Sequence, residues 1–144
     1  MITLQQYFGN KEHSKEQEDN AALLLERAVD LCDEAVADGE FRWTIDPDTG
    51  TCISGSKGGA GDGGFRAPDS TTGGPGSAHR EARGVDVYDP KNLLDIWLDC
   101  FETADGGNLM LEQHRLYREA GKHTPGWCHL TTRAPKSGRR TFDI

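Results

Sequence analysis

The sequence has no long run of apolar residues and relatively few positive charges. No stretch of about 18 consecutive apolar residues occurs, so no membrane span is expected. The first residues lack a basic segment followed by an apolar one, so a Sec signal peptide is not expected either. The formal net charge of -8 argues against general binding to nucleic acid, because such binding depends on Lys and Arg neutralising phosphates.

Closely spaced cysteines are also absent. Four cysteines are scattered along the chain, and none belongs to a C-x-x-C pair: Cys32, Cys52, Cys100 and Cys128. A zinc site built from thiolates usually needs close pairs, and a disulfide framework belongs to exported proteins. We therefore expect buried, reduced thiols.

The low apolar content limits the size of the core. Only 35% of the residues are hydrophobic and 18 of the 144 are glycine, which indicates one small domain over residues 1–144. Glycine, serine and small polar residues dominate a stretch at about residues 55–76, which predicts a long surface loop. This loop would be either a rim that orders over a peptide or a tolerated insertion.

The rest of the sequence alternates irregularly between helical and strand patterns. Residues 16–38 predict the clearest helix, because apolar side chains recur at spacings of three and four: Leu24, Leu25, Ala28, Leu31, Cys32 and Ala35. Further helices are expected within residues 91–107 and 108–121. Strands are expected near residues 41–45, 51–54, 84–88 and 127–133. Too little helix separates the strands for repeated βαβ units, so we predict an α+β fold.

One carboxylate in the expected strand at 84–88 needs a partner. Val85 and Val87 alternate with Asp86 and Tyr88, which is the pattern of a half-buried strand. Burial of a carboxylate costs free energy unless the carboxylate is paired. In the expected strand at 127–133, His129 lies on the same face as Trp127. If these two strands pair, Asp86 and His129 face each other across the ladder.

His79 is a third candidate for the same site. It ends the glycine-rich stretch, and the turn REARG lets the chain double back so that His79 and Asp86 meet at one point. Two imidazoles and one carboxylate are three ligands, the number a catalytic zinc uses while leaving a fourth position for water. The alternative is a plain hydrogen-bonded pair of His79 and Asp86, with His129 elsewhere.

Several segments together resemble a known family. S-x-H-x(6)-D, here Ser77 to Asp86, and the later W-x-H, here Trp127 to His129, resemble the zinc D-Ala-D-Ala carboxypeptidases, which share their fold with the Hedgehog signalling domain. The segment GGFRAP is similar to the S-G-[FY]-R-[ST]-P segment of that family. MITLQQYF at the start and YREAGKHTPGWCHLTTRAPKSGRRTF at the end are similar to the opening and closing segments of small phage-encoded members.

The resemblance implies a zinc-dependent peptidase that hydrolyses peptide bonds of bacterial peptidoglycan, as a D-Ala-D-Ala carboxypeptidase or an endopeptidase. His79, Asp86 and His129 would bind Zn²⁺ on a small central antiparallel sheet flanked by helices. Arg66 would engage the substrate, and Ser77 would orient the first ligand. The partner would be a peptidoglycan stem peptide. The protein would be a monomer in the cytoplasm of an infected bacterium until lysis, or would be carried on the virion.

One departure from the family pattern bears on catalysis. Active members commonly carry Asp or Glu three residues before the final histidine, where this chain has Gly126. Glu119 is the nearest earlier carboxylate, and it would be either the general base or an ordinary residue at a helix end. His123 is a weaker alternative. The second functional hypothesis is therefore a catalytically silent, zinc-containing module that binds the cell wall or serves as a structural part of a phage.

The last segment is rich in positive charge. Four basic residues follow the final expected strand without an acidic residue among them: Arg133, Lys136, Arg139 and Arg140. This tail would either attract the acidic wall polymer or simply be a solvated end.

Overall fold

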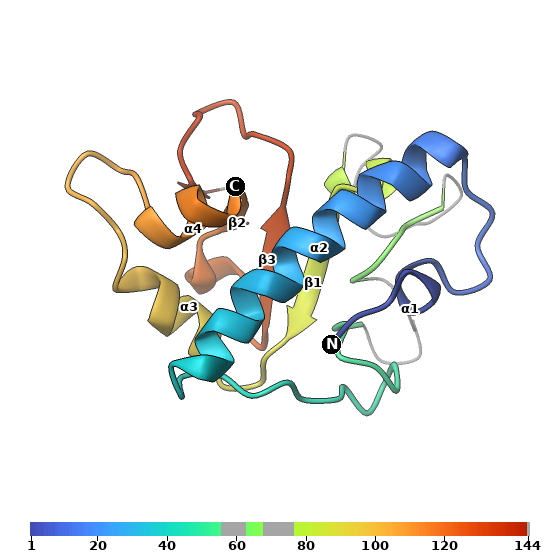
Figure 1. Cartoon of the computed structure of the whole chain (residues 1–144), viewed down its shortest axis with the longest axis horizontal. Helices are drawn as coiled ribbons and strands as arrows, with labels where there is room; N and C mark the ends of the chain where they lie inside the picture. Colours follow the sequence, from blue (N-terminus) through green and yellow to red (C-terminus); the bar gives the residue numbers. More distant parts are fainter. Residues whose placement is uncertain (56–62, 68–76, 144) are drawn as a thin grey trace.

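The computed structural model describes residues 1–55, 63–67 and 77–143, and most of the glycine-rich loop expected at about 55–76 lies outside them. Figure 1 shows a long helix crossing a small sheet. In chain order, the elements of the described residues are α1 (Leu4–Phe8), α2 (Lys15–Ala37), η1 (Ala78–Glu81), β1 (Gly84–Tyr88), α3 (Leu93–Asp99), α4 (Leu109–His114), β2 (Tyr117–Glu119), η2 (Gly121–His123), β3 (Trp127–Thr131) and β4 (Thr141–Phe142).

Within the described residues, four strands form one sheet in the order β1-β3-β2-β4. β3 pairs antiparallel with β1 and with β2, whereas β4 pairs parallel with β2. The α+β class is therefore confirmed, but the sheet is mixed, and the expectation of an antiparallel sheet was wrong for its last strand. β4 runs parallel to β2 because the loop after β3 reverses the chain, which then passes to the far side of β2.

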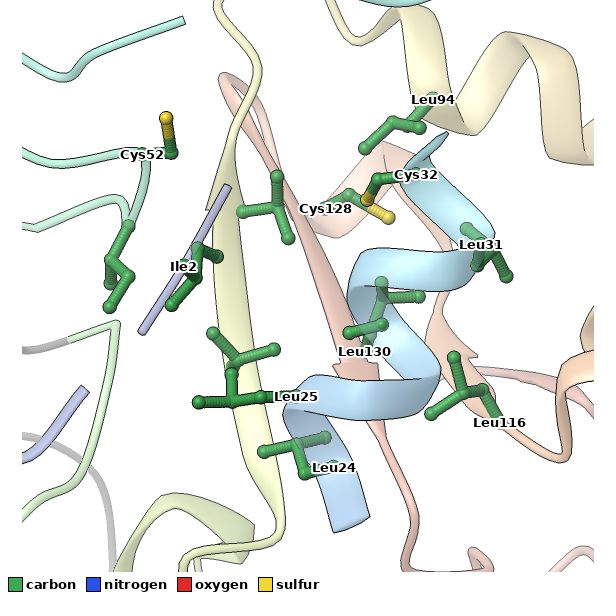
Figure 2. Packing of buried hydrophobic residues seen from close by; sticks show 14 of the residues in the cluster. Ile2, Leu24, Leu25, Leu31, Cys32, Cys52, Leu94, Leu116, Cys128 and Leu130 are labelled. Carbon is green, nitrogen blue, oxygen red and sulfur yellow. The ribbon is translucent and has the colours of Figure 1, made fainter. Parts of the chain in front are cut away.

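The helix expected at 16–38 is α2, and it crosses one face of the sheet (Figure 1). Ser14 and Gln17 form a capping box at its start. Two glutamates in the first turn interact favourably with the positive end of the helix dipole. Its whole apolar stripe is buried, in one cluster with Cys128 and Leu130 of β3 (Figure 2). Burial of each Leu side chain in this cluster stabilises the fold by about 1.5–3 kcal/mol, so the cluster holds the helix and the sheet together.

The region before β1 differs from the expectation. Residues 41–45 and 51–54 do not pair as strands, and in this fully described part of the chain only isolated bridges occur: Asp46 with Thr51, and Ile53 with Val87. The carboxylate of Asp46 accepts hydrogen bonds from the backbone N–H groups of Asp48 and Gly55. Those bonds favour a turn over a strand, because the aspartate competes for backbone donors that a ladder would use.

The helix expected over 108–121 ends early. α4 stops at His114 because Arg115 adopts the left-handed conformation with φ of 55° and closes the helix. The chain then turns into β2. Leu116 and Arg118 are both buried, so the segment follows the period of a strand rather than that of a helix.

Arg118 explains why a strand is favoured there. Its side chain is 1% exposed, and Nη1 donates to Oδ1 of Asp95 at 3.0 Å. Nη2 contacts the carboxylate of Asp99, and Nε donates to Oγ1 of Thr141 at 3.0 Å. A helix through this segment would aim the guanidinium elsewhere, whereas the strand lets it join α3, β2 and β4.

The described helices and the cysteines can be compared with two further expectations, the absence of a membrane span and the burial of the thiols. None of the helices in the described part of the chain has the length and hydrophobicity that a membrane span requires. Cys32, Cys52 and Cys128 are buried free thiols, as expected, but Cys100 is exposed because it lies at the solvent-facing end of α3.

Candidate metal centre

The ladder between β1 and β3 places Asp86 directly opposite His129. Val85 and Val87 point to the other side of β1 and are fully buried in the core, so Asp86 points to the face of the sheet away from that core. Oδ1 of Asp86 lies 2.7 Å from Nδ1 of His129. The two strands do pair, and Asp86 and His129 then face each other, as the alternation in each strand requires.

His79 reaches the same carboxylate from η1. The hydroxyl of Ser77 caps this short helix and accepts a hydrogen bond from the backbone N–H of His79 at 3.3 Å. Nδ1 of His79 lies 2.9 Å from the carbonyl oxygen of Gly64. Since a carbonyl can only accept, this contact assigns the ring proton to Nδ1 and leaves the lone pair on Nε2. Nε2 lies 3.4 Å from Oδ1 of Asp86.

The three side chains could hold a metal ion. One ligand atom each from His79, Asp86 and His129 lies within 4.8 Å of the others. In a tetrahedral zinc site with bonds of about 2.0–2.1 Å, ligand atoms lie about 3.3 Å apart. The distances of 2.7 Å and 3.4 Å from the carboxylate oxygen to the two imidazole nitrogens fall on either side of that value. Both distances are therefore compatible with ligands of a single ion.

The charges around Asp86 keep its carboxylate ionised. Desolvation by burial tends to raise the pKa of Asp86, but the electrostatic and hydrogen-bonding effects of His79 and His129 outweigh it, and the pKa lies well below its ordinary value. Arg66 is a cation beside the same carboxylate, with Nη2 3.8 Å from Oδ2. The carboxylate is thus in the state that a metal requires of its ligands.

A short segment, residues 63–67, fixes both ends of the ligand set. The carbonyl of Gly63 accepts from the backbone N–H of Asp86 at 2.8 Å, and the N–H of Arg66 donates to the carbonyl of His79 at 3.2 Å. A Cβ at Gly63 would lie 2.0 Å from the carbonyl oxygen of Ser54. A residue without a side chain is therefore needed where this segment approaches β1.

Helix α1 contacts both β1 and the segment 63–67 through Tyr7. The hydroxyl of Tyr7 donates to the carbonyl of Gly84 at 2.8 Å, and the N–H of Phe65 donates to the carbonyl of Tyr7 at 3.1 Å. Burial, reinforced by the charge of Asp86, raises the pKa of Tyr7 far above its ordinary range, so the phenol remains a donor. Helix α1 thus holds Gly84, at the start of β1, together with the segment that carries Arg66.

A cavity of about 360 Å³ lies over the three candidate ligands. Six residues that the sequence nominated for the site line it: Arg66, Ser77, His79, Asp86, Glu119 and His129. The lining also includes residues that the sequence analysis did not assign to this site: Ala78, Trp127, Thr131, Arg133, Pro135 and Phe142. Thr131 could have been nominated, because it lies two positions after His129 on the same face of β3. Phe142 gave no local signal, because only the pairing of β4 with β2 brings it near.

Glu119 lies at the end of β2 and not at a helix end. Desolvation by burial raises its pKa; the charge of Asp86 acts in the same direction, while His129 and His123 oppose it. A carboxyl group with a raised pKa beside a candidate metal site has the properties of a proton acceptor and donor. His123 does not line the cavity, and its Nε2 lies 3.0 Å from Oδ1 of Asp143.

Comparison of the chain with protein-family models, with curated proteins and with solved structures found no significant match.

Proposed function

We propose that this protein is a zinc-dependent hydrolase of peptide bonds, and that its substrates are stem peptides of bacterial peptidoglycan. The observation that carries the proposal is the convergence of His79, Asp86 and His129 within 4.8 Å, in a cavity that Glu119 also lines. The substrate class follows from the resemblance of the S-x-H-x(6)-D and W-x-H segments to those of the zinc D-Ala-D-Ala carboxypeptidases.

The donor set fits zinc better than it fits harder cations. Two neutral imidazole nitrogens with one carboxylate are a common zinc combination, whereas Ca²⁺ and Mg²⁺ prefer sets made only of oxygen. The contact of His79 Nδ1 with the carbonyl of Gly64 is the type of second hydrogen bond that orients a metal-binding histidine. A bound zinc ion supplies Lewis acidity, which activates water and polarises a carbonyl group.

Glu119 takes the role of general base in this proposal. Its raised pKa suits it to accept a proton from the attacking water and then to donate that proton to the departing amine. Glu119 is half-buried, so its carboxylate is partly shielded from water where it lines the cavity. Glu119, on β2, would thus replace the acidic residue that active family members carry at the position of Gly126.

Arg66 and Ser77 take the role of substrate contacts. The guanidinium of Arg66 is 13% exposed at the cavity, and its Nη1 lies 3.4 Å from the hydroxyl of Ser77. A guanidinium held in this way can bind a carboxylate with a charge-assisted, forked hydrogen bond. It would accordingly hold the free carboxylate of a peptide, or the oxyanion that develops during hydrolysis.

The test is hydrolysis of purified peptidoglycan by the zinc-loaded protein. We expect new amino groups to appear, their release to stop on chelation, and the activity to return when zinc is added. A protein that binds zinc stoichiometrically but releases no amine from sacculi of several wall types would contradict the proposal.

That negative result is the expectation of the second functional candidate, a zinc-containing wall-binding or structural module. The specific observation in its favour is Gly126, which has a φ of 94° and cannot supply a carboxylate. In that case the protein would sediment with sacculi in a zinc-dependent way and leave them intact.

A further inference from the structure

The positive charges of this acidic protein are concentrated in one part of the chain. Residues 113–142 contain seven of the 16 Lys and Arg residues but only one of the 24 acidic residues, Glu119. The remaining sequence is therefore strongly negative, whereas the part that builds β2, β3 and β4 is positive. This part also supplies one side of the cavity, through residues of all three strands and of the loop between β3 and β4.

Arg133 is the basic residue of that loop that reaches the cavity. It follows β3, lines the cavity together with Thr131 and Pro135, and donates its backbone N–H to Oγ1 of Thr131 at 3.0 Å. Its side chain is 37% exposed, and its Nη1 donates to the carboxylate of Glu81. Lys136 and Arg139 are exposed and do not line this cavity.

The side chains of Arg66 and Arg133 contact the two ends of the short helix η1, which carries His79. Arg66 contacts Ser77, the N-cap residue of the helix, whereas Arg133 contacts Glu81, its last residue. A 3₁₀ helix rises by about 2.0 Å per residue, so these two anchor points are about 8 Å apart along the chain. His79, one of the candidate ligands, lies between them.

We propose that Arg133 determines substrate specificity by binding a second carboxylate of the substrate, on the side of the cleaved bond opposite to Arg66. This inference rests on the proposed function, because it takes the cavity to be a peptide site. An extended peptide advances by about 3.3 Å per residue, so two or three of its residues match the span of about 8 Å between the two residues of η1 that the arginines contact. The preferred substrate is therefore a peptide with a carboxylate at its end and an acidic residue two positions earlier.

The contact with Glu81 is compatible with this role. A guanidinium has five N–H donors in a planar fork, so one carboxylate on Nη1 does not prevent a second anion from binding the same group. Glu81 also lies 3.9 Å from Nε of Arg83, and its carboxylate is thus shared between two arginines. We assign Glu81 as a positioning residue that holds Arg133 towards the cavity.

The test compares two non-hydrolysable tripeptides that differ in one charge. Both end in D-Ala-D-Ala with a reduced scissile bond and a free terminal carboxylate, and the first residue is either Glu or its uncharged analogue Gln. Binding to the zinc-loaded protein is measured by titration calorimetry. We expect the wild-type protein to bind the Glu peptide at least about tenfold more tightly, because a charge-assisted hydrogen bond at a partly exposed site contributes about this much.

Substitutions then identify the residue responsible. Arg133→Gln should bring the ratio of the two affinities close to one, and Glu81→Gln should reduce the ratio partially. The matched control is Arg139→Gln, which removes the same charge from the same loop but outside the cavity, and which should keep the wild-type ratio. Zinc content and circular dichroism show whether each variant is folded.

The outcomes separate this inference from the proposed function. Equal affinities for the two peptides in the wild-type protein, binding of neither peptide, or a ratio that survives Arg133→Gln would each overturn the role of Arg133. A preference that depends on Arg133 in a protein that hydrolyses no peptidoglycan would support the inference and reject the proposed activity. Hydrolysis of the corresponding cleavable peptides without any preference would do the opposite.

Discussion

Asp86 and His129 are direct neighbours across the β1–β3 ladder, and their side chains meet with Oδ1 2.7 Å from Nδ1. The same oxygen lies 3.4 Å from Nε2 of His79. One carboxylate oxygen therefore lies between two imidazole nitrogens at the base of a cavity.

Removal of one candidate ligand should remove the metal. We expect His79→Ala to reduce bound zinc from about one equivalent to nearly none. Loss of a group that merely hydrogen-bonds to a metal ligand lowers metal affinity by about 10–100-fold, and loss of the ligand itself should cost more. Elemental analysis of purified protein measures this directly. His123→Ala, outside the cavity, is the control and should keep the wild-type zinc content; a zinc-replete His79→Ala protein would refute the ligand assignment.

Removal of the candidate base should affect turnover but not metal binding. Glu119→Gln should lower the rate of amine release from peptidoglycan by about 100- to 10,000-fold, the usual contribution of general acid–base catalysis. Zinc content should stay at the wild-type level. Glu112→Gln, on the exposed surface of α4, is the matched control. Unchanged hydrolysis by the Glu119→Gln protein would show that another group transfers the proton.

Gly84 should be needed for the position of the His129 ring. A Cβ at this position would lie 3.0 Å from Cε1 of His129 and 3.1 Å from Cβ of Ala78, which is closer than ordinary contact distance. Gly84→Ala should therefore displace the imidazole and weaken zinc binding by about tenfold, a loss comparable to that of a hydrogen bond that orients a metal-binding histidine. Competition with a chromophoric chelator measures the affinity.

The neighbouring Val85→Ala distinguishes this effect from a general loss of stability. Val85 is fully buried on the core side of β1, so its truncation should cost roughly 2 kcal/mol of unfolding free energy. Its zinc affinity should remain close to that of the wild type. If both substitutions weakened zinc binding equally, the contact between Gly84 and His129 would not be the cause.

The protonation of Asp86 predicts how the metal-free protein responds to acid. Burial tends to raise the pKa of Asp86, yet the imidazoles of His79 and His129 keep it below its ordinary value. Because the pKa is lower in the folded state, the unfolded state binds more protons in the range between the two pKa values. The contribution of Asp86 to stability is therefore complete above the ordinary carboxyl pKa of about 3.9, and it is lost as the pH falls below that value.

Thermal unfolding of the metal-free protein between about pH 6 and about pH 3 tests the sign of this effect. The melting temperature of the wild type should fall more steeply than that of Asp86→Asn, which has no carboxylate to protonate. Asp30→Asn, at an exposed position of α2, should follow the wild type. A steeper fall in the Asp86→Asn protein would mean that the sign is wrong.

Arg118 should be the most important single cation for stability. Its removal leaves the carboxylate of Asp95 buried without its partner, and burial already tends to raise the pKa of that group. We expect Arg118→Ala to lower the free energy of unfolding by about 3–5 kcal/mol, as for other broken buried ion pairs. Lys122→Ala removes a cation from an exposed pair with Asp143 and should cost less than about 1 kcal/mol. Urea denaturation compares the two, and similar losses would contradict the importance given to burial.

Some features of the fold were predictable because their causes are local. The spacing of Leu24, Leu31 and Ala35 predicted α2, since only one face of a helix can meet the core. The alternation around Asp86 and His129 predicted β1 and β3, and it placed the two side chains face to face on the condition that these strands pair, which they do. In both cases the period of the apolar residues along the chain is the same as the period of burial.

Other features depend on contacts between distant residues and were missed or predicted wrongly. The pattern of residues 108–121 favoured a helix, but the guanidinium of Arg118 requires partners on α3 and β4, and this turns Tyr117–Glu119 into a strand. Residues 41–45 alternate like a strand but find no partner strand. The local pattern of apolar residues indicates which secondary structure a segment prefers. It does not indicate which other segments will pair with its backbone N–H and C=O groups.

The sequence by itself determined the kinds of side chain available for a site: an aspartate and a histidine within two strand patterns, a histidine before the first of them, an arginine after two glycines, and a chain with its positive charge near one end. Only the tertiary structure decided which of them meet. Glu119 lines the cavity because β2 lies beside β3, and Arg133 lines it because the loop after β3 returns past η1. The physical reason is that side-chain chemistry is a local property, whereas distance between residues far apart in sequence depends on the packing of the whole chain.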